Sequence, residues 1–129
     1  MEYGYRKKIN LSFEKAIEKA RSELTKEGFG VLTEIDVRDT LKKKLDVEFD
    51  NYIILGACNP PFAHKSLLVE KEIGLLLPCN VIVYQNEDDV YVSAIVPSVA
   101  MNMVENKELK IIAQEVENKL KKVVDNINT

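Results

Sequence analysis

The spacing of apolar residues in the N-terminal part of the chain predicts a strand followed by a helix. Residues 2–9 alternate between apolar and polar side chains, the pattern of a half-buried strand, with Lys7 as the exception on the apolar face. Across residues 13–24, apolar side chains recur every three or four positions, which predicts an amphipathic helix. Ser12 is placed to cap this helix, and Gly28 to end it in the left-handed conformation.

Strands and helices continue to alternate through the middle of the chain. Residues 31–35 predict a short strand, and Asp36 can cap a second helix along the apolar stripe of residues 37–45. Residues 52–57 are apolar on both faces, which is typical of a central strand. The two prolines that follow fit only the first turn of a helix, so a third, short helix is expected from there to about Lys71.

The last part of the chain predicts a hairpin and a long helix. The β-branched runs 81–84 and 90–96 flank a polar loop of hairpin length and are expected to pair antiparallel. From about Asn106 to Ile127, apolar residues repeat every three or four positions, as in a terminal helix laid on the sheet. The resulting order is β-α-β-α-β-α-β-β-α in a single domain, residues 1–129. A run such as 90–96, if left as an uncovered edge, favours a homodimer with two-fold pairing.

Composition narrows the class of protein. The chain has 129 residues, of which 46% are hydrophobic and 30% charged, as is typical of a globular domain. The net charge is −3 and neither half carries a basic excess, so no nucleic-acid partner is expected. The longest apolar run, residues 73–77, is far short of the ~20 residues that span a bilayer, and the N-terminus lacks a signal-peptide pattern. We therefore expect a cytoplasmic protein with no membrane partner.

The tyrosines raise an alternative that the charge argues against. Tyrosines on neighbouring strands can stack the bases of single-stranded RNA. Because the chain is acidic, we expect them instead to be ordinary strand residues of the core. All five fall in predicted strands, at Tyr3, Tyr5, Tyr52, Tyr84 and Tyr91.

The two cysteines stand at the ends of predicted elements, where binding sites are usually built. Cys58 ends the central strand, just before Asn59, whose position predicts the cap of the third helix. Cys79 lies just before Asn80, where the next strand begins. If these two strands are antiparallel, both thiols lie at the same end of the sheet and should be near each other. His64, the single histidine, is in the first turns of the third helix, where a solvent-facing side chain is the usual outcome.

Three segments of the chain closely resemble a known family. Residues 28–37, 54–60 and 74–81 are similar to the motifs of the prokaryotic domain-of-unknown-function family 302. The resemblance implies an α+β fold with a single curved, mainly antiparallel five-stranded sheet and helices packed mainly on one face, similar to half of the TATA-binding-protein saddle. It also suggests association as homodimers. It implies no established activity, and the saddle-like fold does not by itself indicate DNA binding.

Three functions fit the candidate site. The first is a binding module, with a pocket for a small ligand or a soft metal ion lined by Cys58, Asn59, Cys79 and Asn80, and with His64 as a further contributor. The second is a thiol-dependent enzyme or redox protein, in which the helix N-terminus favours the Cys58 thiolate. The third is a structural homodimer with inert cysteines. The sequence has a single histidine and no pattern that pairs a nucleophile with an activating base, so the binding module is favoured over an enzyme. A shared, solvent-reachable cavity at the two cysteines would distinguish the binding module from the other two functions.

Overall fold

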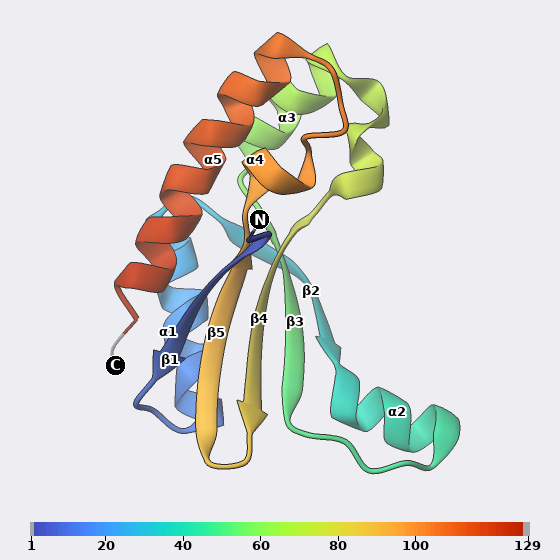
Figure 1. Ribbon diagram of the computed structural model, residues 1–129, viewed down its shortest axis with the longest axis vertical. Coiled ribbons are helices and arrows are strands. Elements are labelled where there is room, and N and C mark those ends of the chain that lie inside the picture. Colours follow the sequence, from blue (N-terminus) through green and yellow to red (C-terminus); the bar gives the residue numbers. More distant parts are fainter. Residues whose placement is uncertain (1, 128–129) are drawn as a thin grey trace.

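A five-stranded antiparallel sheet organises the chain (Figure 1). The computed structural model describes residues 2–127. The spatial order of the strands is β1-β5-β4-β3-β2, and every neighbouring pair is antiparallel. This confirms the expected α+β class and the antiparallel pairing of the third and fourth strands. The strands are β1 (Gly4–Ile9), β2 (Gly30–Asp36), β3 (Tyr52–Cys58), β4 (Cys79–Asn86) and β5 (Asp89–Ile95).

The helices follow the expected order, with two short additions. The main helices are α1 (Phe13–Lys26), α2 (Val37–Leu45), α3 (Pro60–Val69) and α5 (Lys107–Asp125). The additions are a 3₁₀ helix, η1 (Lys71–Leu76), and the single turn α4 (Pro97–Ala100). Both are too short to show a helical period in the sequence. Within residues 2–127, no helix has the length and apolar character needed to cross a membrane.

One face of the sheet is closed by α1 and α5. In Figure 1, α1 lies behind the strands, and α5 runs along the left side of the sheet and past its upper end. Alternate strand residues point toward these helices and form the core, as the period of two requires. The buried residues in this cluster include Ile53, Leu55, Val81, Val83, Val92 and Ala94 from the sheet, Ala16, Ala20 and Leu24 from α1, and Leu120 and Val123 from α5.

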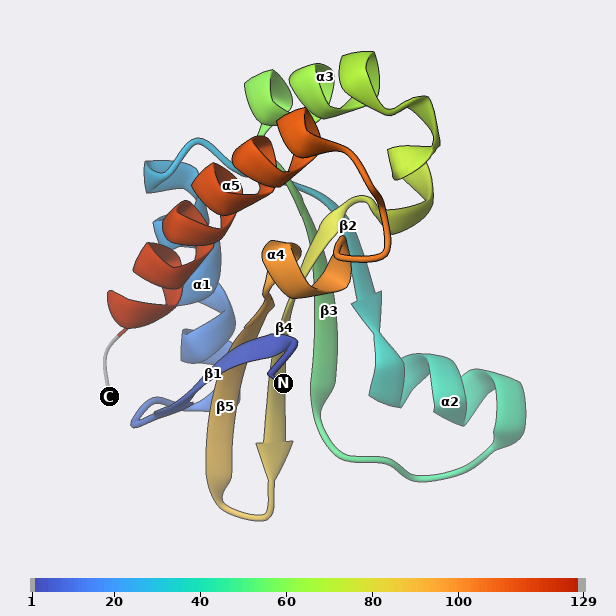
Figure 2. The same cartoon turned by 45° about the horizontal axis from the view of Figure 1, so that its top comes forward.

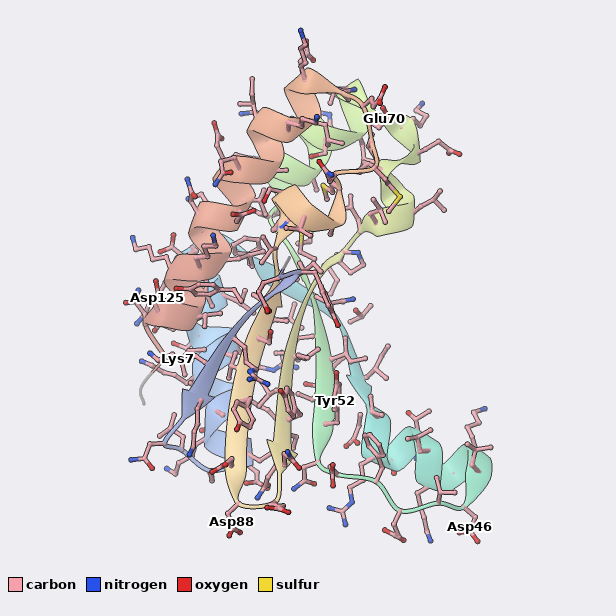
Figure 3. All side chains as sticks on the ribbon, viewed as in Figure 1. Lys7, Asp46, Tyr52, Glu70, Asp88 and Asp125 are labelled. Atoms are coloured by element: carbon pink, nitrogen blue, oxygen red, sulfur yellow. The ribbon has the colours of Figure 1, made fainter. Side chains whose placement is uncertain are left out.

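Lys7, the charged exception in β1, anchors the end of α5 (Figure 3). Its Nζ donates hydrogen bonds to the carbonyl oxygens of Asp125, at 3.0 Å, and Ile127, at 2.6 Å. The hydroxyl of Tyr5 donates to Oδ1 of Asp125 at 2.7 Å. A cation at a helix C-terminus satisfies unpaired carbonyls and the negative end of the helix dipole. The polar break in the strand pattern therefore joins β1 to α5.

Among residues 2–127, no helix lies across the opposite face of the sheet (Figure 1). Two expectations about the strands are wrong. β5 lies between β1 and β4, so residues 90–96 are not an uncovered edge and do not favour a homodimer on that ground; the homodimer stays a prediction. The edge strands are β1 and β2. Three tyrosines expected in the core stand instead in one row on this bare face, because Tyr52 pairs with Tyr84 and Tyr84 with Tyr91 across the strands. We call this bare side the open face.

Gly56 allows a close approach between strands at the upper end of the sheet. A Cβ on Gly56 would overlap Oγ1 of Thr33 and lie 2.8 Å from Cγ of Pro78. The threonine side chain can rotate away, but the proline ring is rigid and sits just before β4. An added methyl group would therefore push Pro78 off the sheet.

We predict that Gly56→Ala lowers the free energy of unfolding by about 1–3 kcal/mol, the usual cost of overpacking a tight site. The matched control is Gly30→Ala, because a Cβ on Gly30 meets no atom within 4 Å. Urea denaturation of both variants measures the difference. Equal effects of the two substitutions would contradict the close approach at Gly56.

Candidate functional site

A cavity of about 340 Å³ lies where β3 ends and β4 begins. It is enclosed by α3, by the segment from η1 to β4, by α4 and by the middle of α5, which meet at the upper end of the sheet (Figure 2). Leu32 and Leu67 also line it, and these side chains are 68% and 39% exposed, so the cavity reaches solvent. Its wall includes Phe29, Ala57, Cys58, Asn59, Phe62, Ala63, Ser66, Leu77, Pro78, Cys79, Pro97, Met101, Ile112, Ala113 and Val116.

Both cysteines line this cavity. Cys79 stands directly opposite Ala57 in the register of β3 and β4, and Cys58 is the next residue along β3. Cys79 is buried and Cys58 is half-buried. Burial, and to a smaller extent the neighbouring Cys58, raises the pKa of the Cys79 thiol to about 11. Cys79 is therefore a neutral thiol at physiological pH, and Cys58 is the more accessible sulfur.

Asn59 lies in the cavity wall at the expected N-cap position of α3, where its carbonyl oxygen accepts a hydrogen bond from the backbone nitrogen of Ala63 at 2.9 Å. Its side chain makes no capping hydrogen bond to the helix. Instead, Nδ2 donates to the carbonyl oxygen of Glu27 at 3.1 Å. That carbonyl precedes Gly28, which has the expected left-handed conformation with φ at 86°. The Asn59 amide thus joins the turn after α1 to the start of α3, and this contact holds one side of the cavity together.

The structure does not place Asn80 or His64 at the cavity. Asn80 follows Cys79 on β4 and does not line the cavity, but it borders an adjoining depression of about 260 Å³ that shares Leu77, Pro78, Cys79, Pro97 and Met101 with the cavity wall. His64 is exposed on α3 and does not line the cavity. A ligand contact for either residue stays a prediction. Within the described part of the chain, no group of three or more His, Cys, Asp or Glu side chains could hold a metal ion.

The wall is apolar, and its few polar groups are engaged within the protein. None of the residues that line the cavity is Lys, Arg, Asp, Glu or His. The hydroxyl of Ser66 donates to the carbonyl oxygen of Phe62 at 2.8 Å, one turn earlier in α3. Such a wall cannot compensate the desolvation of a charged ligand, whereas it can accept a neutral apolar one. Most of these wall residues were missed by sequence reasoning, because their apolar side chains look like ordinary core residues.

Glu117 of α5 fixes α4, and the wall residues Pro97 and Met101 stand at the start of α4 and just after its end. Its Oε1 accepts a hydrogen bond from the backbone nitrogen of Ser98 at 3.0 Å, and its Oε2 pairs with Nζ of Lys121 at 3.0 Å. Burial alone would raise the pKa of this carboxyl, but the bonds from Ser98 and Lys121 outweigh burial and lower it. The ionised Glu117 therefore holds Pro97 and Met101 in place over the cavity.

We predict that Glu117→Gln lowers the free energy of unfolding by about 1.5–3 kcal/mol at neutral pH, the range for a hydrogen bond to a charged group. Because the folded pKa is lowered, this stabilisation is present above the ordinary carboxyl pKa of 4.5 and is lost as the pH falls through the folded value. The difference in the free energy of unfolding between the wild type and Glu117→Gln should thus become smaller at acid pH. Exposed Glu115 on the same helix, changed to Gln, is the control. A difference in the free energy of unfolding that does not change with pH would contradict the role of ionised Glu117 in holding α4.

We further predict unequal alkylation of the two thiols in the folded protein. With iodoacetamide near pH 8, the Cys79→Ser variant should be alkylated at its remaining thiol, Cys58. The Cys58→Ser variant should be alkylated far more slowly, because its remaining thiol, Cys79, is buried and has a pKa of about 11. Mass spectrometry at several pH values measures both rates. Equal rates in the two variants would show that the burial described for Cys79 is wrong.

Comparisons with known proteins agree with the fold and add no activity. No curated protein matches the chain. The crystal structure of an uncharacterized conserved protein DUF302 from Bacillus stearothermophilus is similar, with a TM-score of 0.93 and 29% sequence identity, covering 99% of this chain and 100% of that one. The family model described as domain of unknown function DUF302 matches residues 5–127. Because this match spans nearly the whole sequence, the chain belongs to the DUF302 family.

Proposed function

We propose that this protein binds a small, neutral, apolar organic molecule in the cavity between the ends of β3 and β4. The observation that carries the proposal is a solvent-reachable space of about 340 Å³ whose wall has no ionisable group other than the thiols of Cys58 and Cys79. Ligand sites in proteins are mostly apolar hollows of at least about 300 Å³. The two thiols are the polarisable groups that a ligand would meet at the sheet end of the cavity.

The volume limits the size of the ligand. An apolar cavity of about 150 Å³ stays dry and accepts benzene. The present cavity has about twice that volume, so it suits a fused two-ring molecule or a short branched chain. Removing about 250 Å² of such a ligand from water at ~25 cal/mol per Å² contributes roughly 6 kcal/mol. That free energy corresponds to a Kd of about tens of micromolar, before the cost of ordering the ligand and the wall side chains is subtracted.

The alternatives have less support. A thiol-dependent enzyme using Cys58 needs a nearby base, and the sole histidine, His64, does not line the cavity. A soft metal ion would have two thiols as its donors, and the raised pKa of Cys79 opposes the thiolate form that metals bind. A structural homodimer with inert cysteines would leave the cavity without a role.

Fluorescence titration with naphthalene, a neutral fused two-ring molecule, tests the proposal. The wild type should bind the probe with a Kd of about tens of micromolar. Ala63→Phe places a ring inside the cavity and should weaken binding at least tenfold. His64→Phe, at the next position of α3 but outside the cavity, is the matched control and should leave the Kd unchanged. Equal affinities of the wild type and Ala63→Phe would overturn the proposal.

A further inference from the structure

The depression of about 260 Å³ beside the cavity has its own opening to solvent. Residues from η1, the start of β4, the end of β5 and α4 enclose it, and Figure 2 shows α4 beside the start of β4. Leu75 of η1 borders the depression and is 82% exposed, so a molecule can reach the depression from outside. The cavity opens elsewhere, at Leu32 and Leu67.

The cavity and the depression meet at a shared partition. The side chains that line both hollows are those of Leu77, Pro78, Cys79, Pro97 and Met101. Because the same side chains face both spaces, at most one layer of side chains separates them. Met101 follows directly after α4, and its long, unbranched thioether is the part of this partition that adapts most easily to a ligand. One molecule can therefore occupy the cavity and the depression together.

The two hollows differ in the hydrogen bonds that they offer. The polar groups of the cavity wall are engaged within the protein, as the Asn59 amide is by the carbonyl oxygen of Glu27. In the depression, Asn80 is the one lining residue whose side chain carries an amide or a hydroxyl group. It is exposed, and no side chain or backbone group of residues 2–127 forms a hydrogen bond with it. Its amide donors and carbonyl oxygen are thus available to a ligand.

The charge of the two walls limits the head group that such a ligand can carry. Neither hollow is lined by Lys, Arg, Asp, Glu or His. A carboxylate or ammonium group would lose part of its hydration there without gaining an opposite charge. A hydroxyl or carbonyl group can instead exchange its bonds to water for a bond to the Asn80 amide.

We propose that the ligand is an apolar molecule with one neutral hydroxyl or carbonyl group, which Asn80 binds in the depression while the apolar body fills the cavity. This inference rests on the proposed function and names the class of ligand. Nδ2 of Asn80 donates to the oxygen of either group, and Oδ1 accepts from a hydroxyl. The cavity sets the size of the ligand, and Asn80 sets its orientation.

Titrations with naphthalene and with 2-naphthaleneethanol, which adds a short chain and a hydroxyl to the same rings, test the inference. Asn80→Ala should weaken binding of the alcohol about three- to tenfold, the usual net effect of one hydrogen bond, and should leave the Kd of naphthalene unchanged. Ala100→Leu fills the depression without lining the cavity, so it should also weaken binding of the alcohol alone.

Asn86→Ala is the matched control for the loss of the amide. Asn86 is also exposed on β4, but it lies at the other end of the strand, beyond Tyr84 of the open face. This variant should bind both probes as the wild type does. Circular dichroism of each variant shows whether it is folded.

The outcomes separate this inference from the proposed function. If the wild type binds naphthalene but Asn80→Ala and Ala100→Leu bind the alcohol as well as the wild type does, the role of Asn80 is wrong and the cavity remains a binding site. If the wild type binds neither probe, the proposed function fails and this inference fails with it. Tighter binding of the anion 2-naphthaleneacetate than of the alcohol would contradict the neutral head group.

Discussion

The antiparallel pairing of β3 with β4 is the constraint on which the candidate site depends. These strands are joined by α3 and η1, a connection long enough for a parallel crossover. Because the strands run in opposite directions, the end of β3 and the start of β4 lie side by side, and the connection must arch over one end of the sheet. The register that sets Ala57 against Cys79 therefore places both cysteines under that arch. A parallel arrangement would hold them about 20 Å apart.

The cavity results from how α5 is placed over this arch. The lower half of the helix closes the core with α1, and its C-terminus is held by Lys7 of β1. The upper half continues beyond the strands and meets α3 and α4, where Glu117 fixes the turn of α4. Side chains in this region have sheet on one side only, so the space between the helices is bounded by apolar surfaces but is not filled. The same one-sided packing of helices leaves the other face of the sheet bare.

The element order and the strand pairing could be predicted from the sequence because each depends on local periodicity and on the family motifs. The placement of Cys58 beside Cys79 followed from those two facts. The wall of the cavity could not be predicted, because it depends on how α3 and α5 pack together and on η1 and α4, which are too short to leave a period. The tyrosines were misplaced for a different reason: alternation shows that a strand has two faces, but it does not show which face the helices cover. Asn59 has the sequence context of a cap, but a carbonyl brought close by the tertiary fold binds its amide instead.

A crystal structure of the protein under xenon pressure is a direct test of the cavity, because xenon enters apolar cavities without needing a specific contact. We expect xenon density between Ala57, Phe62 and Ile112, with the surrounding side chains unmoved. A space already closed by these side chains, with no xenon at the ends of β3 and β4, would contradict it.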